Sequence, residues 1–386
     1  MRSATPNASI GHKTALGAER HKARSQATGN EPCLFVQHWR EAGSALEQDW
    51  NNTFARNLQG GGACSKKSPD RSACSGNGAG KIMKVLLIAG GWSSEREVSL
   101  AAVPGLTRAL EELGHTVTFF DLKKDFDGLL AQAQVHDFAF INLHGAPGED
   151  GLVQAMLDSV GCPYQGAGPA GSFLALNKAC AKQIFRAQGI PTSDWDFLPD
   201  RPDSSWQPSF PYPVFVKSCT GGSSLRMGRA SSRAELDSVL DDIFAHGEGA
   251  LVEPALPGHD VTCAVLGSTP LPPILILPQK GDFFDFVSKY QDGGAQEICP
   301  APIPDEVTRK LQEYTLKAAR ALGLGGWARG DFILGEDGSL NILEVNTLPG
   351  MTPASLVPKA AAAAGMSFAD LIGRLIELGL ARHAKQ

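Results

Sequence analysis

Short apolar runs alternate with helical patterns from residue 83 onward. Three of these runs read as strands: "KVLLIA" (residues 84–89), "HTVTFFD" (115–121) and "DFAFINL" (137–143). Helical stretches flank them, so the pattern predicts a parallel sheet with helices on its faces. Ligands of such sheets bind beyond the carboxyl ends of the strands. Polar segments follow two of the strands at that end, "GGWSSERE" (90–97) and "LHGAPGEDG" (143–151).

The first polar segment contains a signal for the start of a helix. Ser94 is a good N-cap and Glu97 stands three residues later, which predicts a capping box. Glu95 then falls at the first helical position, where the helix dipole favours a carboxylate. It could equally receive the ammonium group of a ligand. In the second segment, His144 is either a turn histidine or a pocket donor, and the residues alone leave both open.

A second unit begins near residue 170. A helical stretch carries Lys178 near its start, and the strand "YPVFVK" closes on Lys217. The loop that follows, "SCTGGSSLRMG" (218–228), is rich in glycine and serine. Backbone N–H groups of such a loop can cradle phosphate oxygens while a lysine neutralises their charge. Loops of this composition are common, so this signal alone is weak.

A third unit combines a strand, a long loop and a hairpin. The strand "ALVE" ends in Glu253, and Asp260 follows a Pro-Gly turn. The loop "GDFFDFVSKYQDGGAQEICPAP" (281–302) carries three phenylalanines with Lys289 and Tyr290. Long loops in compact domains are often lids over a site, and we expect one here.

The hairpin "RGDFILGEDGSLNILEVN" (329–346) carries polar side chains at one end. Asp337-Gly338 is a preferred two-residue turn that needs positive φ at both positions. Counting outward from it, Asp331 pairs with Glu344, and Arg329 pairs with Asn346. Two opposed carboxylates repel unless a positive charge lies between them, and their oxygens suit a hard cation such as Mg²⁺. An exposed polar face near a strand end would produce the same pattern.

Composition narrows the class of protein. The chain has 386 residues, a net charge of −6 and 42% hydrophobic residues. We therefore expect two or three domains, no nucleic-acid partner and, without an 18-residue apolar run, no membrane span. The eight cysteines form no C-x-x-C pair, which fits a reducing cytoplasm. Residues 1–82 carry a net charge of +5 and no apolar periodicity, so we expect a disordered extension, or an upstream start with the working protein beginning at Met83.

Six motifs together carry a resemblance to a known family. The segments "GGWSSEREVSL", "NLHGAPGEDG", "VKSCTGGSS", "SKY", "GWARGDF" and "EVNTLPGMTPASLVP" resemble, in this order, those of D-alanine–D-alanine ligases of the ATP-grasp superfamily. The resemblance covers residues 83–386 and leaves out residues 1–82. It implies an N-terminal Rossmann-like α/β domain with a parallel sheet (83–168), a central ATP-grasp domain (169–253) and a C-terminal ATP-grasp domain with the metal and substrate sites (254–386). The last two are α+β domains that clasp ATP.

The resemblance also implies a reaction. ATP phosphorylates the carboxylate of one D-alanine, and the amine of a second D-alanine attacks the acyl phosphate. The dipeptide D-alanyl-D-alanine, a peptidoglycan precursor, is released with phosphate and ADP. Phosphoryl transfer of this kind needs charge neutralisation more than covalent help.

Site residues follow from the same resemblance. The metal ligands, for two Mg²⁺ or Mn²⁺ ions, are Asp331, Glu344 and Asn346. The ATP contacts are Lys178, Lys217, Ser224, Glu253, Asp260 and Lys289. The catalytic residues are Glu95, Ser223, Tyr290, Arg329, Gly350 and Ser355. The substrate contacts are Glu95, His144, Arg329, Ser355 and Leu356. Glu95 binds the ammonium group of the first D-alanine, and Ser223 and Tyr290 bond to it and hold the lid shut.

The chain departs from the family pattern at four positions. Gly221 stands where the phosphate loop usually has Glu, and Arg226 stands at its last Gly position. Arg226 could add a phosphate contact or strain the loop. Pro254 replaces a common basic residue, and Asp260 is shorter than the usual Glu. These departures affect how the nucleotide is held, not the reaction.

Three functions fit these residues. The first is D-alanine–D-alanine ligation, and the second is joining D-alanine to D-lactate or D-serine. Tyr290 disfavours the lactate version, because relatives that use lactate change the lid at this position. The third is binding of nucleotide and amino acid without catalysis, which the retained Arg329 and metal ligands disfavour. The family resemblance further suggests a homodimer with small-molecule partners.

Overall fold

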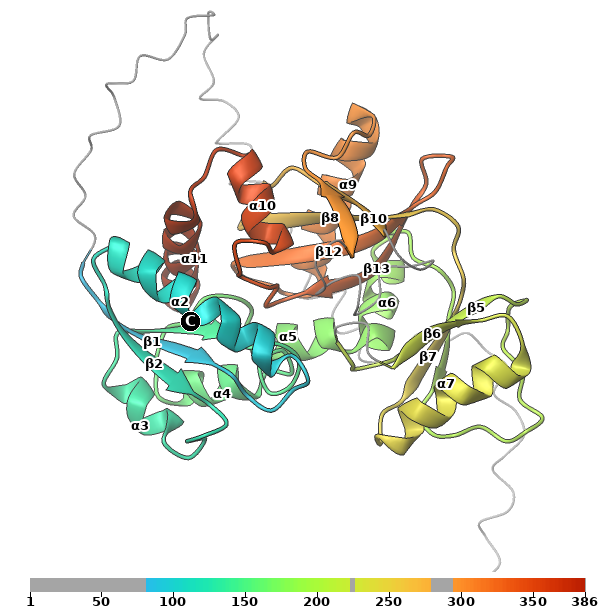
Figure 1. Cartoon of the computed structure of the whole chain (residues 1–386), viewed down its shortest axis with the longest axis horizontal. Helices are drawn as coiled ribbons and strands as arrows, with labels where there is room; N and C mark the ends of the chain where they lie inside the picture. Colours follow the sequence, from blue (N-terminus) through green and yellow to red (C-terminus); the bar gives the residue numbers. More distant parts are fainter. Residues whose placement is uncertain (1–80, 223–225, 279–293, 386) are drawn as a thin grey trace, which may run out of the picture. The chain divides into compact units, whose positions relative to one another are not determined.

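A computed structural model describes residues 81–222, 226–278 and 294–385 (Figure 1). Its first part is a three-stranded parallel sheet in the order β2-β1-β3. The elements are β1 (Lys84–Ala89), α2 (Arg96–Glu112), β2 (Thr116–Asp121), α3 (Leu129–Gln134), β3 (Phe138–Asn142) and α4 (Leu152–Ser159). Five of the six β1 residues are buried, as expected of a central parallel strand covered on both faces. The predicted parallel sheet is confirmed.

The second part is a four-stranded antiparallel sheet in the order β4-β7-β5-β6. Two helices precede it, α5 (Pro169–Leu176) and α6 (Lys178–Ala187). Its elements are β4 (Asp196–Leu198), β5 (Val214–Ser218), β6 (Met227–Ala230), α7 (Arg233–Ala245) and β7 (Ala250–Pro254). Leu236, Leu240 and Ile243 recur on α7 at helical spacing and share a buried cluster with sheet residues such as Val216. The amphipathic face of α7 therefore covers this sheet.

The third part is an antiparallel sheet in the order β11-β10-β8-β12-β13, with β9 paired to β8. Its strands are β8 (His259–Leu266), β9 (Thr269–Pro270), β10 (Ile274–Pro278), β11 (Ala295–Ile298), β12 (Trp327–Leu334) and β13 (Leu340–Asn346). The helices are α9 (Asp305–Ala321), α10 (Leu356–Ala363) and α11 (Phe368–His383). Each of the three sheets falls in one predicted segment, except that β7 runs one residue past the predicted boundary at 253. The domain division itself stays a prediction.

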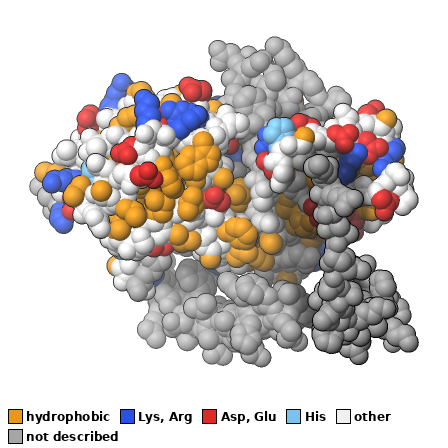
Figure 2. Space-filling view, turned by 90° about the horizontal axis from the view of Figure 1, so that it is seen from below, with side chains coloured by type: hydrophobic (Ala, Val, Ile, Leu, Met, Phe, Trp, Pro, Cys, Tyr) orange, Lys and Arg blue, Asp and Glu red, His pale blue; other side chains and the backbone are white. Residues whose placement is uncertain are grey.

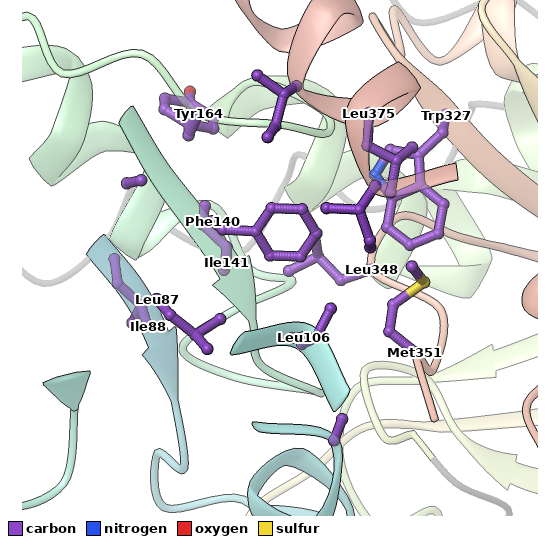
Figure 3. Packing of buried hydrophobic residues seen from close by; sticks show 14 of the residues in the cluster. Leu87, Ile88, Leu106, Phe140, Ile141, Tyr164, Trp327, Leu348, Met351 and Leu375 are labelled. Atoms are coloured by element: carbon purple, nitrogen blue, oxygen red, sulfur yellow. The ribbon is translucent and has the colours of Figure 1, made fainter. Parts of the chain in front are cut away.

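The largest buried cluster joins the two ends of the described chain. Helix α11 lies beside α2 (Figure 1). Figure 3 shows Phe140 of β3 in one cluster with Trp327 of β12, Leu375 of α11 and Leu348 of the segment after β13. All four side chains are at most 3% exposed. The segment after β13 is therefore packed directly against the parallel sheet.

The hairpin of β12 and β13 has the predicted pairs but not the predicted turn. Asp331 lies opposite Glu344, and Arg329 lies opposite Asn346. Gly338 has a φ of +78°, whereas Asp337 is not among the described residues with positive φ, and Gly335 bonds to Ser339 across a longer turn.

Next to the turn, the residues of β12 and β13 therefore pair one position away from the predicted register. A bulge at Asp331/Phe332 shifts the register back by one residue. Leu343 is the extra residue in β13. A bulge places two successive side chains on similar sides of a strand, and both Leu343 and Glu344 line the same cavity. The predicted pairs of Asp331 and Arg329 are therefore correct only because the longer turn and the bulge offset each other.

The predicted capping box on the first helix is wrong. Helix α2 begins at Arg96 with Glu95 as its N-cap, and no side chain caps it. The Oγ of Ser93 instead accepts a bond from the Glu95 N–H at 3.3 Å. Ser94 and Glu97 are exposed. Because the helix starts later than expected, Glu95 stands before its first turn and not within it.

No helix in the described residues is both long enough and apolar enough to cross a membrane.

Candidate active site

A cavity of about 710 Å³ is lined by residues of both antiparallel sheets and by Lys178 at the start of α6. This volume lies within the usual range for ligand sites. Of the predicted site residues, the cavity brings together Lys178, Lys217, Glu253, Asp260, Arg329, Asp331, Glu344 and Leu356. Residues separated by more than 170 positions in the chain thus meet in one place.

Asp331 accepts hydrogen bonds from three side chains. Arg329 donates to both of its carboxylate oxygens, from Nε at 2.8 Å and from Nη2 at 2.7 Å. The Nδ2 of Asn346 donates to Oδ2 at 2.8 Å. The Oγ1 of buried Thr262, opposite it on β8, donates to Oδ1 at 2.6 Å. Sequence reasoning missed Thr262, because nothing in the sequence says that β8 is the strand beside β12.

Glu344 has its own cation. The Nζ of Lys178 lies 3.2 Å from Oε2 of Glu344 and donates to the carbonyl oxygen of Gly221 at 2.6 Å. Lys178 is 7% exposed, so a charge there needs partners. The two facing carboxylates are therefore each matched by a nearby positive charge, as their repulsion requires.

The donor set fits a magnesium-type cation. Asp331, Glu344 and Asn346 offer two carboxylates and one amide oxygen on one face of the hairpin. Oxygen ligands of this kind are those preferred by Mg²⁺ and Mn²⁺. In the part of the chain that the structure describes, no three His, Cys, Asp or Glu side chains come together as metal ligands. The fit therefore rests on the amide together with the two carboxylates.

Glu253 stands between two lysines. Lys182 Nζ lies 2.5 Å from Oε1, Lys217 Nζ contacts Oε2, and the Oγ of Ser193 donates to Oε1 at 2.8 Å. Burial acts to raise the pKa of Glu253, but the two ammonium groups outweigh it and lower the pKa to about 2. Burial lowers the pKa of Lys182 to about 8. Sequence reasoning missed Lys182, although it stands one helical turn after Lys178.

Glu95 and His144 lie in a second buried region. Glu95 is 8% and His144 is 6% exposed. A Cβ on Gly222 would lie 3.2 Å from Oε2 of Glu95, so Glu95 reaches the glycine-rich loop. The Nδ1 of His144 donates to the carbonyl oxygen of Leu348 at 3.1 Å, and burial lowers the pKa of this imidazole. Its Nε2 has no hydrogen-bond partner among the described residues.

Glu149 is a second, half-buried acid near this region, and sequence reasoning did not single it out. Its carboxylate accepts from the N–H of Gly145 at 2.8 Å and from the N–H of Leu348 at 3.2 Å. Burial raises its pKa to about 7, and the nearby charges of Glu95 and Glu344 add to the shift. The only sequence signal was its position in the same polar segment as His144.

The segment around Gly350 approaches the start of α10. Ser355 is the N-cap residue, but its Oγ bonds to Oγ1 of Thr352 at 2.8 Å and to the Thr352 N–H at 3.1 Å instead of capping the helix. A Cβ on Gly350 would lie 2.9 Å from Oγ of Ser355, so only glycine fits without a shift. No side chain of the described residues caps α10, and uncapped N–H groups at a helix start favour an anion.

Arg226 bears on one of the alternatives left open by the sequence, a strained loop. Its φ is +50°, a left-handed conformation that costs energy for a residue other than glycine. Its guanidinium donates to both carboxylate oxygens of Glu248, at 3.1 and 2.7 Å. Arg226 is thus strained and bonded to Glu248, and it does not line the cavity.

Four predicted site residues lie outside the described residues: Ser223, Ser224, Lys289 and Tyr290. The same holds for residues 1–80 of the predicted extension. The roles given to all of these stay predictions.

Comparisons with known proteins agree on one family. Residues 184–377 match the family model for the D-ala D-ala ligase C-terminus. The chain is 67% identical over 299 residues to a D-alanine–D-alanine ligase of Desulfovibrio desulfuricans, covering 78% of this chain and 98% of the relative. It is 63% identical over 298 residues to that of Nitratidesulfovibrio vulgaris strain DP4, covering 77% and 98%.

Solved structures agree as well. The D-alanine–D-alanine ligase of Bacillus anthracis complexed with ATP matches with a TM-score of 0.70 and 31% identity, over 79% of this chain and 99% of that one. The sequence relatives and the fold thus point to the same conclusion, and the resemblance seen in the motifs is confirmed. This chain belongs to the D-alanine–D-alanine ligase family.

Proposed function

We propose that this chain joins two D-alanine molecules to D-alanyl-D-alanine at the expense of ATP, for peptidoglycan synthesis. The observation that carries the proposal is the convergence of Lys178, Lys217, Arg329, Asp331 and Glu344 on one cavity. Three cations and two carboxylates in one enclosed place suit a polyphosphate with its metal ions. Relatives at 60–67% identity carry the name of this ligase.

ATP binds in the cavity, with its phosphates beside Lys178 and Lys217. Glu253 and Asp260, which also line the cavity, hold the adenine and ribose. Lys182 keeps Glu253 ionised and fixed, since its ammonium group bonds to Oε1. Ser224 and Lys289 are the further phosphate contacts that the family resemblance implies.

Asp331, Glu344 and Asn346 hold the Mg²⁺ or Mn²⁺ ions, two in number. Ions bound there would neutralise the charge of the transferring phosphoryl group. Arg329 already bonds to Asp331, so its guanidinium lies beside the phosphoryl group as well. It steadies that group and the oxyanion of the tetrahedral intermediate.

The first D-alanine lies between Glu95 and Arg329. Glu95 receives its ammonium group, and Nε2 of His144 faces its carboxylate. The N–H of Gly350 donates to the oxyanion that forms when the second amine attacks. The carboxylate of the second D-alanine binds at the start of α10, at Ser355 and the N–H of Leu356, where the helix dipole favours an anion. Ser223 and Tyr290 bond to Glu95 and close the lid.

We propose a homodimer that acts in the cytoplasm. Exposed large apolar side chains of the described residues are concentrated before residue 174, among them Trp92, Phe119 and Phe173 at 46–52% exposure. Figure 2 shows one face on which hydrophobic side chains gather between charged ones. A gathering of this kind is a candidate contact surface. The five cysteines of the described part are free thiols, as in a reducing compartment.

The test is release of ADP by the purified protein with MgATP and D-alanine, alone and with D-lactate or D-serine added. Product analysis across pH 6 to 9 identifies the second substrate. We expect D-alanyl-D-alanine as the main product. Substantial D-alanyl-D-lactate would refute the specificity but keep the ligase, whereas absence of ADP release with every acceptor would favour a binding protein without catalysis.

A further inference from the structure

Leu348 is held from three directions. Its carbonyl oxygen accepts from Nδ1 of His144 at 3.1 Å, and its N–H donates to Oε1 of Glu149 at 3.2 Å. Its side chain is 3% exposed and packs with Phe140 and Trp327 (Figure 3). The side chain fixes where Leu348 is, and the two polar contacts fix how its peptide groups are turned.

The loop that supplies both contacts, residues 143–151, is closed on itself. Glu149 donates its N–H to the carbonyl oxygen of Gly145 at 2.7 Å, while Oε2 of Glu149 accepts from the Gly145 N–H at 2.8 Å. The Nε2 of buried Gln154 donates to the carbonyl oxygen of Gly148 at 2.5 Å. A Cβ on Gly148 would lie 2.4 Å from Leu143. Because the loop is so constrained, the carboxylate of Glu149 has a defined place.

The carboxylate of Glu149 makes contacts that a side chain serving only to fill space would not need. Both of its oxygens accept from backbone N–H groups, which an amide of the same length cannot do with its NH₂ group. Burial disfavours the charge, and the nearby carboxylates Glu95 and Glu344 disfavour it further. An acid is therefore kept at a place that disfavours its charge, where both of its oxygens hold backbone N–H groups.

The position of Leu348 in the chain explains what this contact is for. Leu348 stands between Asn346, a proposed metal ligand, and Gly350, the proposed oxyanion donor. The orientation of the two peptide groups of Leu348 sets the direction of the chain toward Asn346 on one side and toward Gly350 on the other. The other contact to Leu348 comes from His144, which faces the first D-alanine. Asn346, Gly350 and His144 must be held in fixed relative positions, because phosphoryl transfer and amine attack take place at the same carboxylate.

We infer that Glu149 is a positioning residue, which together with His144 fixes the Leu348 peptide and thereby holds the N–H of Gly350 in place over the first substrate. This inference rests on the proposed ligase function. Glu149 does not line the cavity proposed for ATP. Its effect is on the geometry of the reacting groups and not on nucleotide binding.

The test is Glu149→Gln, with Glu97→Gln as the matched control on the exposed face of α2. The glutamine has nearly the same size but loses one acceptor. We expect kcat to fall roughly 10-fold to 100-fold, the effect of one charge-assisted hydrogen bond. The KM for ATP should change less than about twofold, because the ATP cavity has no contact with Glu149. The control should match the wild type.

A stability measurement separates positioning from simple support of the fold. The raised pKa means that the folded state disfavours ionised Glu149, so the stability it contributes falls as pH rises from 4.5 through about 7. At pH 8 the Glu149→Gln variant should therefore melt no lower than the wild type, although its kcat is reduced. Glu149→Asp, which keeps the charge but not the reach, should also lose kcat.

Three results would overturn the inference. One is an unchanged kcat in Glu149→Gln, and another is a loss of activity that follows a lower melting temperature at pH 8. The third is a rise in the KM for ATP as large as the fall in kcat. An inactive wild type would instead refute the proposed function, so the two failures are distinguishable.

Discussion

The ammonium group of Lys182 lies 2.5 Å from a carboxylate oxygen of Glu253, and neither side chain is more than 4% exposed. Lys217 contacts the other oxygen. One buried anion thus serves two buried cations. Removing the anion alone would destabilise the fold, because the buried ammonium groups have lost their hydration and would then lack a counter-charge.

Replacing Glu253 by Gln should lower the free energy of unfolding by about 3–5 kcal/mol, the usual effect of breaking a buried ion pair. The reason is that Lys182 and Lys217 would stay buried without a counter-charge. Chemical denaturation monitored by tryptophan fluorescence measures the change. Glu306→Gln is the matched control, since Glu306 pairs with Lys310 at 2.9 Å on the surface and should cost at most about 1 kcal/mol.

The double variant Glu253→Gln/Lys182→Met should be more stable than Glu253→Gln alone. Removing the second charge relieves part of the uncompensated burial, so the two changes should not be additive. Equal stability of the single and double variants would mean that Lys217 alone accounts for the cost.

Acid should weaken the fold partly through Glu253. Its folded pKa is about 2 against an ordinary value of 4.5, so the stability it contributes is present above pH 4.5. That stability is lost as pH falls from 4.5 toward 2, because the unfolded chain takes up the proton first. Melting temperatures of the wild type and Glu253→Gln between pH 3 and 7 test this, and the gap between them should narrow in acid.

Glu344→Gln should nearly abolish turnover while the fold survives. The change removes one of the two carboxylate charges proposed to hold the metal ions that offset phosphate repulsion. It also relieves the repulsion between Glu344 and Asp331, which lies directly opposite on β12. ADP release and thermal melting are the measurements. The control is Glu336→Gln in the exposed turn of the same hairpin. A variant that unfolds would show that Glu344 is mainly structural.

A protein that begins at Met83 should retain full activity and melt at nearly the same temperature. Residues 1–82 have no apolar periodicity in their sequence, so there is no face for them to bury. Steady-state kinetics and melting of both lengths test this. A large loss of activity on removal of these residues would give the segment a function.

Local patterns were sufficient for much of the fold and for part of the site. The apolar runs at 84–89 and 137–143 became buried parallel strands, and the pairing of Asp331 with Glu344 was correct. What the sequence could not supply was the contact between distant segments. Thr262 could be found only by knowing which strand neighbours β12. The sequence places Glu149 in the same polar segment as His144, but its contact with the Leu348 N–H depends on the packing of Leu348 on the parallel sheet.

The errors have local causes. The capping box failed because Ser94 and Glu97 match the pattern by spacing, whereas Ser93 makes the contact and the helix begins at Arg96. The turn failed because an Asp-Gly pair also occurs in longer turns with positive φ at the glycine alone. In both places several residues of similar propensity compete, and tertiary packing decides among them.

The extra residue in β13 has a consequence for how this cavity can be built. In a regular strand, consecutive side chains point to opposite faces, so only one of Leu343 and Glu344 could line the cavity. The bulge lets consecutive residues, Leu343 and Glu344, both line the cavity. Two consecutive residues thereby place an apolar side chain and a carboxylate next to each other in the cavity wall. Deleting Leu343 would restore regular alternation in β13, but it would also remove the apolar side chain that stands beside Glu344 in the cavity wall.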